Sequence, residues 1–356
     1  SVDYANFAIK PGSTSTKVAF FRGAEEIWND VQRFDVDVLR PFATIADQED
    51  FRLEEIRKAL ARHHVSEEDL DAVVGRGGLI KPIPGGTYAV SDAMVEILRA
   101  QKYGAHASNL GAPLAKRLAK GKPAFIVDPV VVDELVPEAR LSGLPQLTRR
   151  SIFHALNQKA VGRRAAADLG KPYEKTNLVI AHLGGGISVG AHLQGRVVDV
   201  NNALDGDGPF SPERSGGLPS GDLARLCFSG TYDMTEVMRK IVGGGGMVAH
   251  LGTNDLREAQ RAASGGDPKA VLVLEAMAYG VAKEIGARAV ALRGKVDAVI
   301  LTGGLAYSEE FVRRIGDQVS WIAPVRIYPG EDELQALAEG ALRVLSGQEA
   351  PRIYED

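Results

Sequence analysis

Three turns rich in glycine and hydroxyl residues are the clearest candidates for chemistry in this sequence. They span residues 10–17 (KPGSTSTK), 181–188 (AHLGGGIS) and 301–305 (LTGGL). The backbone N–H groups of a tight Gly/Ser turn form a concave nest for anions, and hydroxyls and lysines add donors and charge. An ordinary hairpin loop is the alternative for each turn taken singly, because Ser and Gly favour turns anyway. Three such turns in one chain favour anion binding.

The turns differ from the common nucleotide-binding motifs. The first lacks the glycine–lysine spacing of a Walker A loop, and a strand rather than a helix is predicted after it. The second fails the dinucleotide fingerprint, which would need glycine where Val189 stands. The third leads into a predicted helix and could seat a nucleoside. The turns therefore indicate phosphate or nucleotide binding outside those two motif classes.

Charged residues at the ends of predicted strands are the second signal. Arg76, Asp128 and His182 each follow a short apolar run typical of a buried strand. In open α/β sheets, ligands bind outside the carboxyl ends of the strands. Each side chain alone could be a solvated loop residue, but their shared position favours a site.

Two further side chains stand in settings that suit catalysis. Arg214 lies in a loop rich in Pro and Gly (residues 210–217), where a guanidinium fork suits bidentate contacts with phosphate or carboxylate. His154 falls inside the helix predicted over residues 150–169. Taken alone, a surface arginine and a core or surface histidine are the commoner explanations.

The elements that would position these residues alternate between short β-rich runs and longer helical periods, which indicates an α/β fold. Strand–turn–strand units recur at residues 7–21 and 178–189. This weak internal repeat predicts two related halves with a break near residue 150. Capping residues and closing glycines predict helices over residues 91–101, 150–169, 267–293 and 331–345.

Composition narrows the function classes. The 356 residues, 45% of them hydrophobic, can fill roughly two globular domains at about 150 residues each. The formal net charge of −4 is spread along the chain, which argues against nucleic-acid binding. A lone cysteine, Cys227, excludes an intrachain disulfide and a Cys-rich zinc site. With no signal-peptide pattern and no apolar run of about 18 residues, we expect a soluble cytoplasmic protein without a membrane span.

Together these motifs resemble those of the acetate and butyrate kinase family over essentially the whole chain. Residues 178–195 resemble the family's second signature, and residues 76–88 (RGGLIKPIPGGTY) are similar to its butyrate kinase branch. The signature positions are His182, Gly184, Gly186, Ser188 and Gly195. Further matching segments are residues 125–133, 151–161, 201–217 and 301–308.

The resemblance implies two actin-like (ribonuclease H-like) domains of βββαβαβα topology with the nucleotide cleft between them. The first domain would span residues 1–148 and be completed by a C-terminal helix at 333–356. The second, residues 149–332, would carry nucleotide and dimer contacts. The resemblance also implies a homodimer or larger homo-oligomer whose partners are small molecules.

The family's reaction moves phosphate between ATP and a carboxylate, giving ADP and an acyl phosphate, with Mg²⁺. By resemblance, Arg76 and Arg214 would hold the carboxylate and the transferring phosphoryl oxygens. Asp128 would be the catalytic carboxylate, His154 would assist in the transition state, and Glu333 would be the magnesium-linked glutamate. The implied cofactor-binding residues are Ser13, Thr14, Ser15, Lys17, His182, Gly184, Gly185, Gly186, Asp255, Arg257, Gly303 and Gly304.

Two positions sharpen this hypothesis. Lys10 stands where the family has asparagine at the phosphate and metal site, so we expect weakened or altered metal dependence. Gly78 is smaller than its counterpart in acetate-specific members, which favours butyrate or a branched short acid, since each buried methylene contributes ~0.8 kcal/mol.

Two rival functions remain open. One is a catalytically weak nucleotide-binding protein on the same fold, which Lys10 motivates. The other is a different phosphotransferase or phosphatase of the actin-like superfamily, acting on a sugar or polyphosphate. Arg214 and the loop at 201–217 argue against the second, because they match the carboxylate-kinase pattern.

Overall fold

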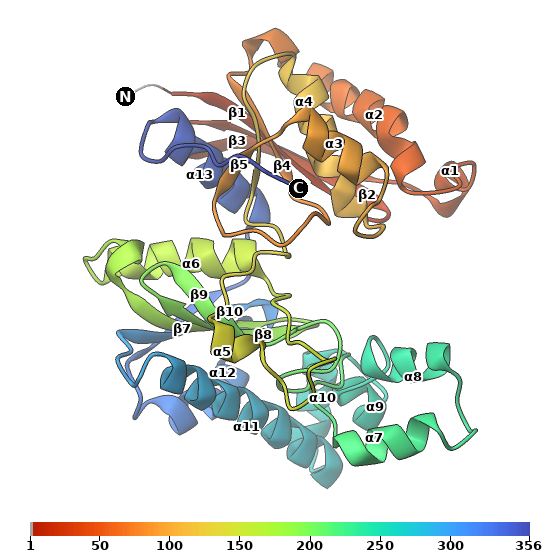
Figure 1. The fold of residues 1–356 in the computed structure, drawn as a ribbon, viewed down its shortest axis with the longest axis vertical. Helices are drawn as coiled ribbons and strands as arrows, with labels where there is room; N and C mark the ends of the chain where they lie inside the picture. The colour runs from red at the N-terminus through yellow and green to blue at the C-terminus, as the bar shows by residue number, and fades with distance from the viewer. Residues whose placement is uncertain (1–2) are drawn as a thin grey trace. The chain divides into compact units, whose positions relative to one another are not determined.

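The protein is described by a computed structural model that covers residues 3–356. The chain forms two compact units (Figure 1). Unit 1 consists of the chain up to Val132 together with Asp332–Asp356, and unit 2 consists of Asp133–Glu331. Residues 133–148, which the sequence analysis assigned to the first domain, therefore fall in unit 2.

Unit 1 is built on a six-stranded sheet of order β3-β2-β1-β4-β6-β5. The strands are β1 (Ala5–Pro11), β2 (Ser15–Arg22), β3 (Glu25–Arg33), β4 (Ala72–Arg76), β5 (Thr87–Ala89) and β6 (Ala124–Val127). The β1–β2 pairing is antiparallel, which confirms the predicted strand–turn–strand unit at residues 7–21. Because β1, β4 and β6 run parallel, their carboxyl ends bring Lys10, Arg76 and Asp128 to one edge of the sheet.

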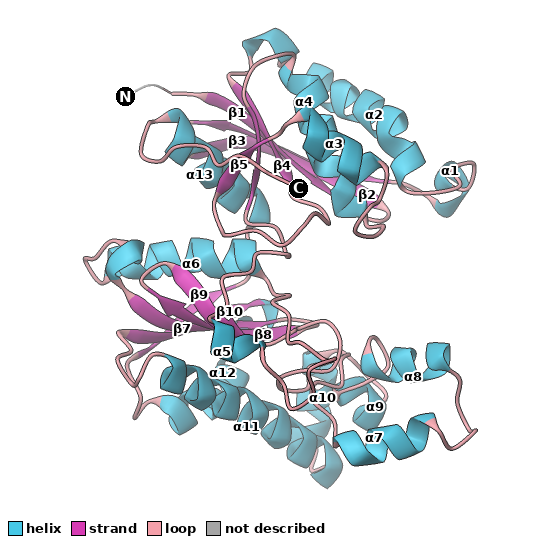
Figure 2. Ribbon diagram, viewed as in Figure 1, coloured by secondary structure: helices cyan, strands magenta, loops and turns pink. Residues whose placement is uncertain are grey.

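Helices cover both faces of this sheet. Figure 2 shows α2, α3 and α4 together on one side and α13 on the other. The helices are α1 (Val36–Leu39), α2 (Glu49–Arg62), α3 (Asp92–Arg99), α4 (Gly111–Ala119) and α13 (Glu333–Leu345). A Cβ on Gly340 would lie 2.6 Å from Val127 Cγ1, so this glycine lets α13 lie directly on β6. That close packing fixes the position of Glu333, the first residue of α13.

Unit 2 contains a five-stranded sheet of order β11-β10-β7-β8-β9. Its strands are β7 (Asn177–Leu183), β8 (Ile187–Leu193), β9 (Arg196–Val200), β10 (Ala298–Gly303) and β11 (Val325–Pro329). The β7–β8 hairpin corresponds to β1–β2, and β10 pairs parallel with β7 as β4 does with β1. The predicted internal repeat is thereby confirmed as two sheets of equivalent strand order.

The helices of unit 2 also lie on two faces, with α6 on one side of the sheet and α11 and α12 on the other (Figure 2). They are α5 (Pro137–Arg140), α6 (Ala155–Asp168), α7 (Ser220–Cys227), α8 (Met234–Ile241), α9 (Met247–Leu251), α10 (Leu256–Ser264), α11 (Pro268–Ala291) and α12 (Glu309–Val319). Across residues 3–356, no helix is both long enough and apolar enough to cross a membrane.

One helix boundary corrects the sequence analysis. The helix predicted over residues 150–169 begins only at Ala155, so His154 is its N-cap rather than an interior residue. The His154 backbone, at φ −78° and ψ 63°, lies outside the helical region, while its carbonyl already accepts the N–H of Gln158 at 2.9 Å. The imidazole makes no capping hydrogen bond to α6 and is stacked on His182 of β7.

Candidate functional site

One charge cluster in unit 1 joins the ends of three elements. The Lys10 Nζ and Arg76 Nη1 atoms lie 2.8 Å and 2.6 Å from the same Glu333 Oε2 atom. We call Lys10, Arg76 and Glu333 the ion triad. The Glu333 carboxylate is 9% exposed, whereas the two cations are each 24% exposed. One carboxylate cannot neutralise two cations, so the ion triad keeps a formal positive charge that suits an anionic ligand.

Two glycines bring Arg76 to this position. A Cβ on Gly75 would overlap the carbonyl oxygen of Gly111, and a Cβ on Gly111 would overlap the carbonyl oxygen of Arg76. Only glycine at both positions lets the end of β4 touch the start of α4. Arg76 is thus anchored by backbone contact as well as by its ion pair.

The structure corrects the argument from Gly78. A Cβ on Gly78 would lie 2.6 Å from Asn109 Oδ1 and 2.7 Å from Asn109 Cα. The expectation that a small residue here leaves room for substrate methylenes is therefore wrong. The space is filled by the short 3₁₀ turn Ala107–Leu110, and glycine is needed for that packing.

The first glycine turn is held from beneath by Arg52, which sequence reasoning missed. Arg52 Nη1 donates to Ser15 O at 2.7 Å, and Nη2 donates to Ser13 O at 3.2 Å. Arg52 is fully buried, and this burial lowers its pKa to about 10. Ser13 and Thr14 remain exposed above it. The turn is therefore rigid, with its hydroxyl side chains on the surface.

Lys17 and Asp128 also border this edge of unit 1. Lys17 lies directly opposite Lys10 in the β1–β2 pairing, so their side chains share a face. Asp128 is buried and has a left-handed backbone, φ 40°. Its Oδ1 accepts the N–H of Gly86 at 2.7 Å, and its own N–H donates to Gly86 O at 3.1 Å. Asp128 thereby fixes the loop that follows Arg76.

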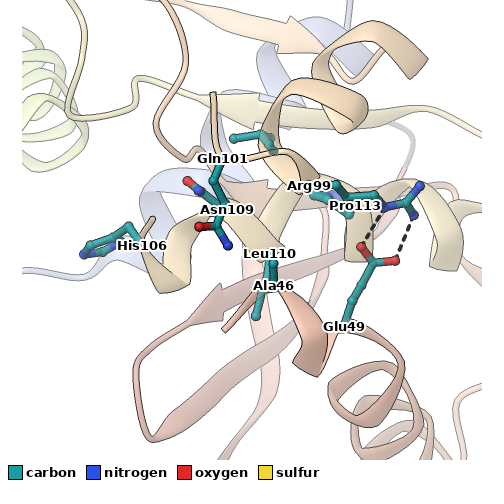
Figure 3. A pocket seen from close by; sticks show the side chains of 9 residues that line it. Ala46, Glu49, Arg99, Gln101, His106, Asn109, Leu110 and Pro113 are labelled. Carbon is teal, nitrogen blue, oxygen red and sulfur yellow. Dashed lines mark hydrogen bonds and ion pairs between the residues drawn. The ribbon is translucent and has the colours of Figure 1, made fainter. Parts of the chain in front are cut away.

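A separate cavity in unit 1 lies among α3, α4 and the 3₁₀ turn Ala107–Leu110 (Figure 3). Its volume is about 10 Å³, room for about one water molecule. Glu49 at its border accepts Arg99 Nε at 2.9 Å and Arg99 Nη2 at 2.8 Å, as the dashed lines in Figure 3 show. The cavity is too small for a ligand, and the ion pair is a structural one.

In unit 2, Arg214 lies against the second glycine turn. A Cβ on Gly186 would overlap Arg214 Nη1, so the guanidinium rests on bare backbone. Arg214 Nη1 donates to Ala203 O at 2.7 Å, and burial lowers the Arg214 pKa. Ser211 ties the two loops together, because its hydroxyl donates to Gly185 O at 2.6 Å and accepts Arg214 N–H at 3.0 Å.

Two histidines stand beside the same turn. The rings of His154 and His182 are stacked with centroids 3.8 Å apart and planes 10° apart. A Cβ on Gly184 would lie 3.3 Å from His182 Nε2, which places this imidazole at the turn. His182 Nε2 is also 3.5 Å from Glu331 Oε2. The structure therefore brings His154, His182 and Arg214 together around one glycine turn.

The residues expected on the nucleoside side have clear local roles. Gly303 has φ 89°, and a Cβ there would overlap Leu183 O, so it is required where β10 meets β7. Gly304 has open space around its Cβ position. Asp255 caps α10 and accepts Arg257 N–H at 2.9 Å, a hydrogen bond that lowers the Asp255 pKa. Their contact with a nucleoside stays a prediction.

The residues do not build a resident magnesium site. Within the described residues 3–356, no three or more His, Cys, Asp or Glu side chains gather in a way that could hold a metal. Glu333, the predicted metal-linked residue, already gives its Oε2 atom to Lys10 and Arg76. Mg²⁺ is commonly held by one or two carboxylates together with substrate phosphates and water. Any Mg²⁺ here would arrive on the nucleotide, as part of the substrate.

Sequence reasoning missed the buried side chains behind the histidines. Asn157, Gln158 and Lys159 are consecutive residues of α6, and all three are buried. Asn157 contacts His182, and Gln158 contacts Ser188, which in turn contacts His154. The available signal was a run of polar residues inside a predicted apolar helix.

Comparison with known proteins places these observations in a family. The sequence model described as the acetokinase family matches residues 115–323, which is more than half of the chain. Acetate kinase from Porphyromonas gingivalis is 20% identical, with a TM-score of 0.79 over 96% of this chain and 100% of that chain. Propionate kinase from Francisella tularensis is 18% identical (TM-score 0.74; 95% and 98% covered). Acetate kinase from Entamoeba histolytica is 15% identical (TM-score 0.73; 94% and 98% covered).

These structural similarities confirm the predicted fold. The two α/β units with equivalent sheets form the actin-like two-domain fold of acetate kinases and related sugar kinases. At these identities the likeness establishes the fold and leaves the roles of single residues to chemical argument.

Proposed function

Because this chain belongs to the acetokinase family, we propose that it is a short-chain fatty acid kinase. It would transfer phosphate from ATP to the carboxylate of butyrate or a branched short-chain acid, giving ADP and an acyl phosphate, and it would also run in reverse. The family uses ATP or ADP with Mg²⁺. Mg²⁺ would be carried by the nucleotide phosphates.

One observation carries this proposal: the guanidinium of Arg214 and the stacked imidazoles of His154 and His182 surround the bare backbone of the β7–β8 turn. Phosphoryl transfer asks the protein mainly for positioning and for stabilisation of charge on the phosphoryl oxygens. Fixed donors in a partly dehydrated site supply that stabilisation without reorganising during the reaction. A turn lined only by apolar groups would not.

The chemical step is a direct in-line transfer. A carboxylate oxygen of the acid attacks the γ-phosphorus, the bond to the β-phosphate oxygen breaks, and its electron pair leaves with ADP. The acid is ionised at neutral pH, so no proton needs to be abstracted. We therefore assign Arg76 and Arg214 to the carboxylate and the phosphoryl oxygens, and His154 to a hydrogen bond in the transition state. Inversion at a chiral γ-phosphorus is expected, and retention would indicate a phosphoenzyme instead.

Asp128 belongs to this proposal as a carboxylate that shapes the acid-binding loop. Its hydrogen bond to Gly86 N–H joins the end of β6 to the segment that follows Arg76. Ser13, Thr14, Ser15 and Lys17 in unit 1, and Gly184–Gly186 in unit 2, would contact phosphates. Asp255, Arg257, Gly303 and Gly304 would contact the nucleoside.

The preference for four or five carbons rests on the similarity of residues 76–88 to the butyrate kinase branch. The packing of Gly78 against Asn109 gives it no support. Hydroxylamine trapping of the acyl phosphate tests it, with ATP, Mg²⁺ and straight or branched acids of two to six carbons. Turnover that peaks at four or five carbons is expected. A peak at two or three would instead assign acetate or propionate.

A second candidate is a catalytically weakened nucleotide-binding member of the same fold. The observation that favours it is the 2.8 Å ion pair between Lys10 and Glu333, which occupies the carboxylate expected to face the metal. ATP binding measured by calorimetry separates the two candidates. Binding without hydroxamate from any acid, together with turnover gained in Lys10→Asn, would establish the weakened enzyme.

We also propose that the protein acts as a homo-oligomer through unit 2. Large apolar side chains stand exposed on α7, α8 and their connection, including Phe228 at 91% and Met234 at 77% exposure. Light scattering of the purified protein would show a dimer or larger species, and a monomer at micromolar concentration would contradict it.

A further inference from the structure

Behind His154 in unit 2 lies a row of buried polar side chains that the proposed reaction does not itself use. Ser188, Gln158 and His192 are each 0% exposed, and Tyr173 is 3% exposed. Ser188 and His192 lie on β8, Gln158 lies on α6, and Tyr173 lies in the 3₁₀ turn before β7. Buried polar groups are costly unless their hydrogen bonds are satisfied. The direction of each hydrogen bond in this row can be worked out.

The direction is fixed first at Gln158. Its Nε2 atom lies 3.2 Å from the Ser188 carbonyl oxygen and 2.8 Å from the Ser188 hydroxyl. A carbonyl oxygen only accepts, so the amide nitrogen must face Ser188. The amide oxygen Oε1 then faces His192 Nε2 at 2.9 Å. The amide of Gln158 therefore cannot be turned round without losing its bond to the backbone.

His192 must then carry its proton on Nε2, because Gln158 Oε1 can only accept. Complete burial and the nearby Lys159 ammonium hold the His192 pKa well below its usual value. A neutral imidazole has one ring proton, so Nδ1 is an acceptor. The Tyr173 hydroxyl donates to it at 2.6 Å. In this row each residue therefore donates a hydrogen bond to the next, from Tyr173 to His192 and from His192 to Gln158.

At the other end, the row reaches His154. Ser188 Oγ already accepts the Gln158 N–H, and it lies 2.8 Å from His154 Nδ1. We infer that Ser188 donates its hydroxyl proton to that nitrogen, and this donation leaves the imidazole proton on Nε2. We propose that Tyr173, His192, Gln158 and Ser188 form a hydrogen-bond relay that holds His154 as its Nε2–H tautomer. On the proposed function, that N–H is the donor offered to the phosphoryl oxygens.

The stacked partner is held in the same way by an independent set of bonds. Asn157 Nδ2 lies 2.8 Å from His182 Nδ1 and 3.3 Å from Thr302 Oγ1. Thr302 donates its own proton to Gly330 O at 3.2 Å, so its oxygen accepts from Asn157. His182 Nδ1 is therefore an acceptor as well. Both imidazoles present Nε2–H, and His182 directs its proton toward Glu331.

A glycine in β8 leaves the space that the Gln158 and His192 side chains occupy. A Cβ on Gly190, in the middle of β8, would lie 2.6 Å from Gln158 Oε1 and 3.4 Å from His192 Nε2. Any side chain there would push Gln158 away from His192. The relay residues are thus positioning residues, which act on substrate only through His154.

The tautomer can be measured directly in the free protein. Two-bond ¹H–¹⁵N correlation spectra of histidine-labelled protein distinguish the two neutral tautomers, and the chain has seven histidines. The His154 signals are identified by their absence in His154→Gln. We expect Nε2–H in the wild type and a mixed population in Gln158→Leu and Ser188→Ala. Ser188→Ala adds no bulk, so it keeps the test informative if Gln158→Leu does not fold.

Activity and rescue provide the second readout. In Ser188→Ala, kcat should fall about tenfold, less than the ~10²–10⁴ that a positioned proton donor contributes, because part of the population keeps the Nε2–H tautomer. KM for ATP should change less than twofold. His192→Gln keeps an N–H donor and should retain the wild-type tautomer, whereas His192→Leu should not. His250→Gln, an exposed histidine of the same unit, is the matched control and should change neither.

The outcomes separate this inference from the proposed function. The Nε2–H tautomer in a protein that makes no acyl phosphate would reject the function and leave the relay standing. A proton on Nδ1 of His154 in the wild type, or an unchanged tautomer in Ser188→Ala, would overturn the relay whatever the activity.

Discussion

The two units share one strand order and use it for different chemistry. In unit 1, the strand ends carry Lys10 and Arg76, which are held by the carboxylate of Glu333. In unit 2, the equivalent edge carries stacked imidazoles whose Nδ1 atoms contact neutral hydroxyl and amide groups. The difference follows from burial: His182 is 2% exposed, where an uncompensated charge would be costly, whereas Lys10 and Arg76 reach solvent.

This contrast suggests a division of labour for the proposed transfer. The partly exposed cations of unit 1 attract anions over a long range, and salt weakens that attraction. The oriented donors of unit 2 act only at contact distance but lose little to screening. On the proposed function, the repeated fold would place two kinds of anion recognition at equivalent strand ends. Four predictions test this contrast between the two units.

The largest effect is expected from the two arginines. Arg76→Ala and Arg214→Ala should each lower kcat/KM about 10³-fold, since an arginine at a transferring phosphoryl group contributes ~10³–10⁵ in rate. The control is Arg225→Ala on α7, whose 79%-exposed side chain forms only an i,i+3 pair with Asp222 among the bonds described. It should leave kinetics unchanged. A loss under threefold in either variant would remove that arginine from the site.

The two units should also lose similar stability when a glycine at a close backbone contact is replaced by alanine. Gly75→Ala in unit 1 and Gly303→Ala in unit 2 each drive a Cβ into a backbone carbonyl. Each should lower the free energy of unfolding by about 3 kcal/mol, the upper part of the range for overpacking. Gly286→Ala in the middle of α11 is the control, because its Cβ position is open. It should stabilise by up to ~1 kcal/mol. Urea denaturation measures all three, and a neutral Gly75→Ala would reject the close contact of β4 with α4.

Much of this scaffold could be predicted from the sequence. The central strands β4, β6, β7 and β10 are short apolar runs, and burial on both faces leaves that pattern unmistakable. The edge strand β3 was missed, since its sequence EEIWNDVQR is largely polar and half-exposed. β11 was missed because it is short, half-exposed and interrupted by Arg326. Buried central strands can be predicted from their apolar sequences. Edge strands cannot, because they form by pairing with neighbours that are distant in the sequence.

The candidate site was predicted unevenly. Arg76, Asp128 and His182 could be found because strand ends are where ligands bind in such sheets. Arg52 and Gln158 could not, because their roles depend on carbonyl groups far away in the chain, Ser15 O and Ser188 O. Gly78 was misread, since nothing in the sequence shows that Asn109 fills the space above it.

A smaller effect is expected at Lys10. Lys10→Asn removes the ammonium from Glu333 Oε2, so the carboxylate becomes available to the Mg²⁺ that accompanies ATP. The Mg²⁺ concentration for half-maximal activity should fall about tenfold, which is about 1.4 kcal/mol. Lys58→Asn on α2, where the lysine pairs with Glu55, removes the same charge elsewhere in unit 1. An unchanged Mg²⁺ requirement in Lys10→Asn would show that Lys10 does not set metal dependence.

The smallest expected effect is on stability as pH falls, and it compares two histidines with lowered pKa values, one from each unit. Burial lowers the pKa of His192 in unit 2 and of His106 in unit 1, with Lys159 and Arg76 respectively adding to the shift. A lowered pKa means that the unfolded chain binds more protons below its own pKa of about 6.5, so stability falls as pH falls through that value. Each group can contribute at most about 1.4 kcal/mol per pH unit. Between pH 6.5 and 5.5, His192→Gln should remove about 1 kcal/mol of this loss.

His106→Gln should remove less, because the His106 side chain is exposed whereas His192 has no exposed surface. Urea denaturation of the wild type and both variants at pH 7.5, 6.5 and 5.5 measures the difference. His250→Gln controls for an exposed histidine of unit 2 and should follow the wild type. If His192→Gln lost stability with pH as steeply as the wild type, His192 would already be charged in the folded protein. Both of its nitrogens would then donate. The uncharged hydrogen bonds by which the relay of unit 2 differs from the ion triad of unit 1 would then be rejected at His192.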